Sequence, residues 1–160
     1  MCPIRRRPLR PSPGPSAARV KPALKLHIIA RGRIGQSPEA ELVQRYAQRL
    51  KGRLAVTEIG DTASWPAFTG GRSVVLDERG RDLPSAELAA ILGRWRDGGA
   101  REVRFLIGAA DGHDAATRAG ADLLLGFGRA TWPHMLVRAM LAEQIYRALT
   151  ILDGHPYHRA

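Results

Sequence analysis

The stretch GFGRATWPHMLVRAMLAEQIYRA, residues Gly126–Ala148, sets two glycines and a Thr-Trp-Pro sequence in front of a long apolar helix. Glycines before a helix N-terminus expose backbone N–H groups to an anion such as phosphate. A Walker loop, however, needs Lys followed by Ser or Thr at the helix start, and Pro133-His134 stand there instead. A dinucleotide fingerprint belongs to the first strand-to-helix turn, whereas this loop lies near the end of the chain. Two interpretations remain: a turn that only caps the last helix, or a cradle for another ligand.

Strand and helix patterns alternate along the chain before this stretch. Apolar and β-rich runs predict strands at Leu24–Ala30, Leu54–Ile59, Ser73–Asp77, Val103–Ile107 and Asp122–Leu125. Helices are predicted from the capping sequence Ser37-Pro38-Glu39 onward, over Pro84–Asp97, in a short segment after Asp114, and over His134–Leu152. This alternation is typical of an α/β fold in which a mostly parallel sheet carries helices on both faces.

Three loops at strand ends are the candidate ligand-binding segments. Ligands of open parallel sheets bind at the carboxyl ends of the strands. The loops Leu76–Arg79, Gly108–Gly112 and Gly126–Trp132 each follow an apolar strand. A turn needs only one glycine at positive φ, so glycine pairs in two of the three loops favour a binding role over a purely structural one.

The basic charge of the chain is concentrated at its start. The 160 residues carry a net charge of +10, and residues 1–22 hold six basic side chains, no acidic one and six prolines. This composition predicts a disordered basic tail, followed by one folded domain over residues 23–160. We favour a translation start downstream of residue 1 as the origin of the tail. An RNA-grasping arm and an organelle-targeting peptide are the alternatives.

The composition also bounds the class of protein. No apolar run approaches the roughly 20 residues that span a bilayer, so we expect a cytoplasmic protein that does not contact a membrane. Cys2 is the only cysteine, which leaves neither a disulfide framework nor a thiolate metal cluster. We therefore expect no metal site.

The last helix and the chain end suggest two further partners. The predicted helix His134–Leu152 is apolar on more than the stripe of about 100° that covering its own sheet requires. A second subunit in a two-fold homodimer would cover the surplus. After the helix, His155, Tyr157, His158 and Arg159 combine aromatic, imidazole and guanidinium groups, a set suited to RNA. A frayed terminus without a role is the alternative.

The C-terminal third carries a family resemblance. The order LIGAADG (residues 106–112), FGRATWPHMLVRAMLAEQIYRA (127–148) and GHPYHR (154–159) resembles the SPOUT, or α/β-knot, methyltransferases, and closely the ribosomal RNA large subunit methyltransferase H family. The resemblance covers about Leu24–Arg159. It implies a C-terminal trefoil knot at the cofactor site, a homodimer, and S-adenosylmethionine as cofactor. It also implies methylation of N3 of a pseudouridine in 23S ribosomal RNA within assembled ribosomes.

The resemblance also implies the residues of the site. By motif match, the cofactor is expected to contact Leu76, Gly108, Phe127, Gly128, Arg129, Ala130, Thr131 and Trp132. Gly128 and Trp132 depart from the serine and leucine usual in the family. His155, Tyr157, His158 and Arg159 are expected to lie over the partner's cofactor and to meet the RNA. Of these, we interpret His158 as the candidate base, Arg159 as an RNA clamp or anion stabiliser, and Tyr157 as a third catalytic candidate.

Two other functions stay open from the sequence. One is a non-catalytic, ribosome-associated RNA-binding module that has kept the fold. The other is a SPOUT methyltransferase that acts on transfer RNA, which the mild charge of residues 23–160 does not exclude.

Overall fold

The computed structural model describes residues 23–158, and of His158 only the backbone. The predicted basic tail, residues 1–22, and Arg159 lie outside the described residues. The elements follow in the order β1 (Lys25–Arg31), α1 (Pro38–Arg49), β2 (Leu54–Ile59), β3 (Arg72–Asp82), α2 (Ser85–Asp97), β4 (Glu102–Ile107), α3 (Ala115–Ala119), β5 (Leu123–Gly126), α4 (His134–Leu152) and a 3-10 turn η1 (Pro156–His158). The predicted bounds of β2 and α4 are confirmed residue for residue. The other elements that were given bounds shift by about one residue, except β3.

The sheet is parallel throughout the described chain. Its strand order is β2-β1-β4-β3-β5, and all four pairings are parallel. The predicted parallel α/β sheet is therefore confirmed. Because β4, β3 and β5 are neighbours that point the same way, their carboxyl ends lie together at one edge. Two of the candidate ligand loops follow β4 and β5, and the third, Leu76–Arg79, lies within β3 at the same edge.

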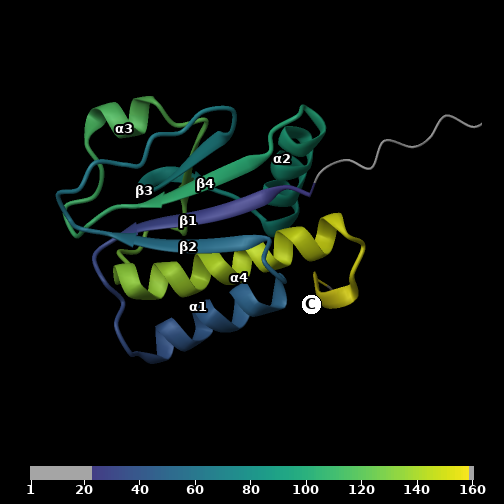
Figure 1. Ribbon diagram of the computed structural model, residues 1–160, viewed down its shortest axis with the longest axis horizontal. Helices are drawn as coiled ribbons and strands as arrows, with labels where there is room; N and C mark the ends of the chain where they lie inside the picture. The colour runs from purple at the N-terminus through teal and green to yellow at the C-terminus, as the bar shows by residue number, and fades with distance from the viewer. Residues whose placement is uncertain (1–22, 159–160) are drawn as a thin grey trace, which may run out of the picture.

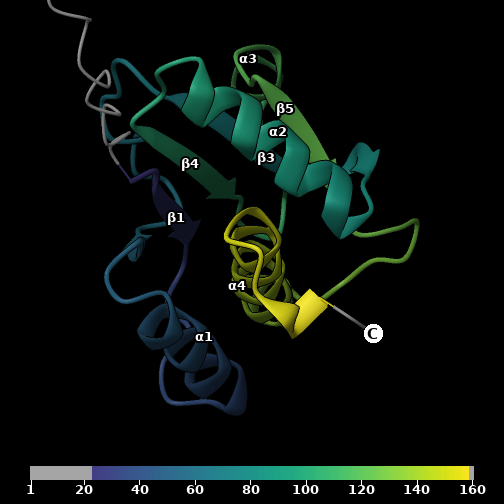
Figure 2. The ribbon, with the colours of Figure 1, turned by 90° about the vertical axis from the view of Figure 1, so that its right-hand side faces the viewer.

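One face of the sheet carries most of the helices. Alternate residues of the inner strands, among them Ile28, Val74 and Phe105, are fully buried and form one core with apolar residues of α1, α2 and α4. Figure 2 shows α1 and α4 on one side of the strands and α3 on the other. Helices on both faces are thus confirmed, but unevenly, since α3 has five residues and none is buried.

The opposite face is covered largely by the irregular segment 60–71 instead of a long helix. The Arg104 Nη1 donates a hydrogen bond to the Pro66 carbonyl (2.9 Å), and its guanidinium lies 4.1 Å from the centre of the Phe68 ring. On the same face the ring of His27 hydrogen-bonds the Thr57 hydroxyl at 2.8 Å. Polar side chains on this face therefore find partners in the segment and in the neighbouring strand.

Arg138 fixes the first half of α4 to the sheet. Its side chain is 1% exposed, and its guanidinium donates to the Glu58 carboxylate (2.8 Å) and to the carbonyls of Arg31 (2.6 Å) and Gly32 (2.9 Å). Burial lowers the pKa of Arg138, and the Glu58 carboxylate opposes that shift. An anionic partner and two carbonyls stabilise this buried cation, although its Nε is buried without a hydrogen-bond partner. It holds the start of α4 at the sheet edge where β1 and β2 end (Figure 1).

The chain passes very close to itself at Gly80. Leu76 pairs with Leu125, residues 77–80 then bow out of the ladder, and Arg81 and Asp82 rejoin β5. A Cβ atom on Gly80 would lie 2.4 Å from the carbonyl carbon of Leu125, so only glycine fits there. Because of this return, β3 extends to Asp82. The predicted strand ended at Asp77, because the polar sequence after that residue lacks a strand pattern. The trefoil knot stays a prediction.

We predict that Gly80→Ala lowers the free energy of unfolding by roughly 3 kcal/mol, the upper range for an overpacked interior. The added methyl group meets backbone atoms, which cannot rotate away. Denaturant unfolding measures the effect. Gly60→Ala is the control, because a Cβ atom there has its nearest neighbour at 3.9 Å. Equal unfolding midpoints for the two variants would show that the close approach at Gly80 does not exist.

Candidate functional site

The three ligand loops line one cavity at the carboxyl edge of the sheet. Its volume is about 290 Å³, at the lower end of small-molecule sites. Of the residues expected to contact a cofactor, those that line the cavity are Leu76, Gly108, Phe127, Gly128, Ala130, Thr131 and Trp132. Arg129 is exposed and does not line it. The structure therefore brings together seven of the eight predicted residues, from loops far apart in the sequence.

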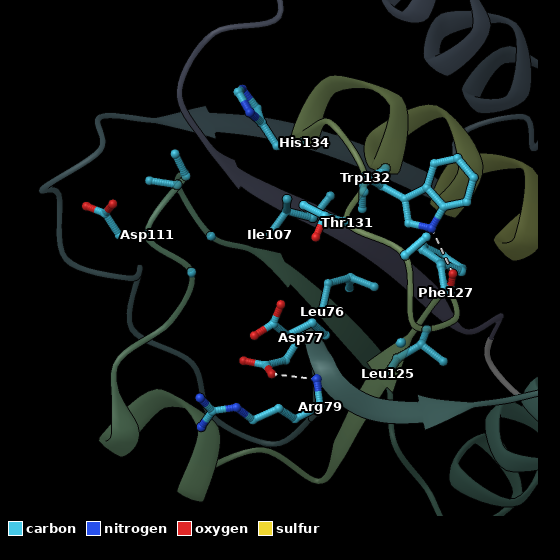
Figure 3. Close-up of a pocket in the computed structure, with 18 of the residues that line it drawn as sticks. Leu76, Asp77, Arg79, Ile107, Asp111, Leu125, Phe127, Thr131, Trp132 and His134 are labelled. Atoms are coloured by element: carbon cyan, nitrogen blue, oxygen red, sulfur yellow. Dashed lines mark hydrogen bonds between the residues drawn. The ribbon is translucent and has the colours of Figure 1, made fainter.

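Two hydrogen bonds fix the conformation of the loop from Phe127 to Trp132. Gly128 has φ +85°, and its N–H donates to the Asp82 carboxylate at 2.7 Å. The Trp132 Nε1 donates to the Phe127 carbonyl at 2.9 Å, which closes the loop on itself (Figure 3). Asp82 was missed in the sequence, since its role depends on β3 returning beside Gly126 after the bow. The loop conformation is thus set by residues of β3 as well as its own.

Charged and apolar groups lie at different ends of the cavity. Figure 3 shows Asp77 and Asp111 on one side and Phe127 and Trp132 on the other. The Asp77 side chain is only 7% exposed, and its carboxylate accepts a hydrogen bond from the Arg79 N–H at 2.9 Å. Both acidic residues follow buried strands inside the predicted ligand loops, although the sequence analysis did not single them out. The cavity therefore offers acidic groups, accompanied by Arg79 and Arg118, at one end and flat apolar surface at the other.

The wall of the cavity beside Asp111 is thin. A second hollow of about 350 Å³ shares Ala109, Asp111 and Gly112 with the first and is lined beyond them by Trp65 and His113. The Ala109 and Gly112 backbones form an isolated bridge that closes this loop. Gly108 cannot carry a side chain, because a Cβ atom would lie 2.7 Å from the Gly112 carbonyl oxygen. Gly108 thus serves close packing within the wall, whereas Gly112 supplies a positive φ of +75°.

His113 is buried behind this wall. It is 7% exposed, and its ring lies 5.6 Å from the ring of Trp65. Burial lowers the pKa of His113, and the Asp77 carboxylate acts in the opposite direction. Arg118 donates to the His113 carbonyl and lies 3.6 Å from Asp77, so it links α3 to both loops. His113 was not singled out in the sequence, where a single histidine in a loop carries no signal of burial.

The C-terminal tail lies away from its own chain's cavity. Tyr157 packs against α4 and hydrogen-bonds the Glu143 carboxylate at 3.3 Å. At 1.5 Å per residue, Glu143 stands roughly 13 Å along the helix from His134, which lines the cavity. His155 is exposed and does not line the cavity either. The side chain of His158 and all of Arg159 lie outside the described residues, so the catalytic and RNA-binding roles of the tail stay predictions.

Two features that residues 23–158 lack bear on the class of site. No group of three or more His, Cys, Asp or Glu residues in this part of the chain is arranged to hold a metal ion. Within the same residues, no helix has the length and apolar character needed to cross a membrane.

Comparisons with known proteins agree with this geometry. A family model described as "Predicted SPOUT methyltransferase" matches residues 67–158, which include all three ligand loops. The chain belongs to the SPOUT methyltransferase family. Relatives named "Ribosomal RNA large subunit methyltransferase H" match most of the chain. The protein of Novosphingobium aromaticivorans is 66% identical over 137 residues, covering 84% of this chain and 97% of the relative.

More distant relatives carry the same name. The Rhizorhabdus wittichii protein is 60% identical over 136 residues, covering 84% of this chain and 97% of the relative. The Paramagnetospirillum magneticum protein is 46% identical over 153 residues, covering 85% and 99%. This SPOUT methyltransferase is thus an enzyme of methyl transfer, as the sequence predicted, and not a non-catalytic module. The matches cover 97–99% of the length of these three relatives.

We predict that His113 titrates below its ordinary pKa of 6.5. The unfolded chain then binds this proton more readily than the folded protein. The free energy of unfolding should therefore be highest above pH 6.5 and fall as the pH drops below it. NMR titration of the ring measures the midpoint, and His113→Asn should weaken the pH dependence of unfolding. A midpoint at or above 6.5 would contradict the buried, neutral ring.

Proposed function

We propose that this SPOUT methyltransferase transfers a methyl group from S-adenosylmethionine to N3 of a pseudouridine in 23S ribosomal RNA. The observation that carries the proposal is the cavity beside the bow of β3 and the carboxyl ends of β4 and β5, lined by three backbone loops. The RNA class is supported by the names of relatives that are 46–66% identical to the chain. We propose assembled ribosomes in the cytoplasm as the setting, as the family resemblance implies.

The cavity fits S-adenosylmethionine in shape and charge. Gly128 has positive φ and no atom within 4 Å of a Cβ position, so a ligand can approach the bare backbone there. Phe127, Trp132 and Leu125 offer apolar surface for a flat base such as adenine. Asp77 and Asp111 suit the positive charges of the sulfonium and ammonium groups. When bound, the cofactor supplies an electrophilic methyl group.

The chemistry at N3 asks two things of the chain. The weakly acidic imide proton must leave, and the anion that develops must be stabilised. We propose His158 for the first role, because an imidazole can accept a proton, and Arg159 for the second, because a guanidinium can stabilise an anion or hold the RNA. Ordering the two reactants can supply up to roughly 7–11 kcal/mol of the barrier reduction, so the protein's main contribution is positioning.

In a homodimer, the C-terminal tail of one chain can reach the cavity of its partner. A groove of about 300 Å³ between α1 and α4 is lined by apolar residues, among them Leu42, Leu136 and Met140. Phe127 lines both this groove and the cofactor cavity. A second copy seated in the groove would thus stand beside the cofactor site. Because each chain's tail packs on its own α4 away from its own cavity, we propose that it serves the partner's cavity.

We predict that Gly128→Val abolishes binding of S-adenosylmethionine and methyl transfer to ribosomal particles. The branched side chain would occupy the space in which the ligand meets the backbone. Calorimetry measures binding, and transfer of labelled methyl measures activity on ribosomal subunits and on transfer RNA. Gly52→Val is the control, since Gly52 also has positive φ and open space, but lies outside the cavity. Unchanged affinity in Gly128→Val, or methylation of transfer RNA alone, would contradict the proposal.

We predict that two inactive subunits complement each other in a mixed dimer. A chain truncated after Gly154 keeps its cavity but lacks the tail, whereas Gly128→Val keeps the tail but has a blocked cavity. In the mixed dimer, the intact tail meets the intact cavity and restores one of the two sites. Methyl transfer by differently tagged, co-purified subunits tests this. Background activity in the mixed dimer, with the wild-type mixture active, would overturn the cross-subunit assignment.

A further inference from the structure

Tyr157 sits in a cluster of aromatic and charged groups on α4. Its ring meets the ring of Tyr146 edge-on, with centres 4.6 Å apart. The guanidinium of Arg147 lies 5.1 Å from the centre of the Tyr157 ring, within the range of a cation–π contact. Tyr46 of α1 stacks at a tilt on Tyr146, 5.7 Å away. The tail is therefore docked through one side chain on residues from two helices.

The hydroxyl of Tyr157 is engaged as well as its ring. It lies 3.3 Å from Glu143 Oε1, the same oxygen that accepts two hydrogen bonds from Arg147, at 3.0 Å and 2.7 Å. The Glu143 and Arg147 side chains are each about a quarter exposed or less, so this pair is partly shielded from solvent. Burial, with a hydrogen bond to Tyr46, raises the pKa of Tyr157 to about 12. The hydroxyl thus stays protonated at neutral pH and donates to the carboxylate.

We infer that Tyr157 is a positioning residue, which anchors the tail through Glu143 and Arg147 and so holds the segment that continues into His158 and Arg159. The anchor ends one residue before those two proposed RNA-facing groups. Further backbone bonds brace the turn, since the His155 N–H donates to the Thr150 carbonyl at 2.8 Å and the Tyr157 N–H to the His155 ring at 3.2 Å. The sequence pattern grouped Tyr157 with the catalytic candidates. Its contacts with α4 support anchoring instead.

The anchor also connects the tail to the dimer groove. Tyr46 and Glu143 both line the groove that we assign to a second copy. The same carboxylate therefore faces the proposed interface and holds the tail. A displaced tail would reduce turnover without blocking the cofactor cavity, because none of the anchoring side chains lines that cavity. This inference rests on the proposed function for its kinetic consequence, but not for the anchoring itself.

Two substitutions separate anchoring from chemistry. Tyr157→Phe keeps the ring contacts and loses only the hydroxyl, so kcat for methyl transfer should fall by roughly 3–10-fold, the worth of one hydrogen bond. Tyr157→Ala loses the whole anchor, and kcat should fall on the order of 100-fold, as for a misplaced catalytic group. The KM for S-adenosylmethionine should stay within about twofold of the wild-type value in both variants, because neither substitution changes a residue that lines the cavity. Asp153→Asn is the control: it removes an exposed ion pair with Arg53 at the same helix end, and kcat should stay near the wild-type value.

Hydrogen exchange of the backbone amides of His155, Tyr157 and His158 tests the anchor independently of activity. Exchange should be faster in Tyr157→Ala than in the wild type, and nearly unchanged in Asp153→Asn. Equal losses of kcat in Tyr157→Phe and Tyr157→Ala would overturn the inference, because the hydroxyl itself would then be the reacting group. Unchanged exchange in Tyr157→Ala would overturn it as well. If the wild type transfers no methyl group, the proposed function fails, and the exchange experiment still decides whether Tyr157 holds the tail.

Discussion

The close backbone approach at Gly80 is the constraint on which the site depends. It lets β3 leave β5 after Leu76, bow outward and return, so that the same two strands pair on both sides of the bow. The bow contributes Asp77 to the cavity, and the return brings the Asp82 carboxylate under the Gly128 N–H. A side chain at Gly80 would separate β3 from β5. It would thereby displace Asp77 from the cavity and Asp82 from the Gly128 N–H. The absence of a side chain at Gly80 thus allows the Asp82 carboxylate to reach the loop that contains Gly128.

The fold could be predicted from the sequence wherever burial of one face makes apolar residues recur at the spacing of a helix or a strand. The helix α4 and the strand β2 have bounds that follow from apolar spacing, and the parallel sheet follows from the alternation of elements. The convergence of the three loops could also be predicted, because parallel neighbours end at one edge. The return of β3 could not, since Arg81 and Asp82 carry no strand pattern and pair only after a non-local crossing.

Long-range polar contacts were the other part beyond prediction. Arg138 looks like a solvent-facing residue in the sequence of α4, yet it is buried on Glu58 and two carbonyls from β1 and the residue after it. The aromatic contact of Tyr157 likewise needs the tail to fold back on α4, which no local pattern encodes. Around the cavity, motif resemblance identified seven residues that the structure brings together and one, Arg129, that is exposed and does not line it. Local chemistry was thus predictable, and the partners supplied by other elements were not.

A division of labour along α4 connects fold to function. Its first turn borders the cavity at the sheet edge, its middle carries Glu143, which holds Tyr157, and the groove beside α1 lies between them. The central claim is that this arrangement serves methylation of ribosomal RNA. Mass spectrometry of RNA from a strain that lacks the gene tests it most directly. The account predicts that one pseudouridine of 23S ribosomal RNA loses its N3-methyl group and regains it with the wild-type gene, but not with Gly128→Val. An unchanged 23S ribosomal RNA, with a methyl group lost from transfer RNA instead, would contradict it.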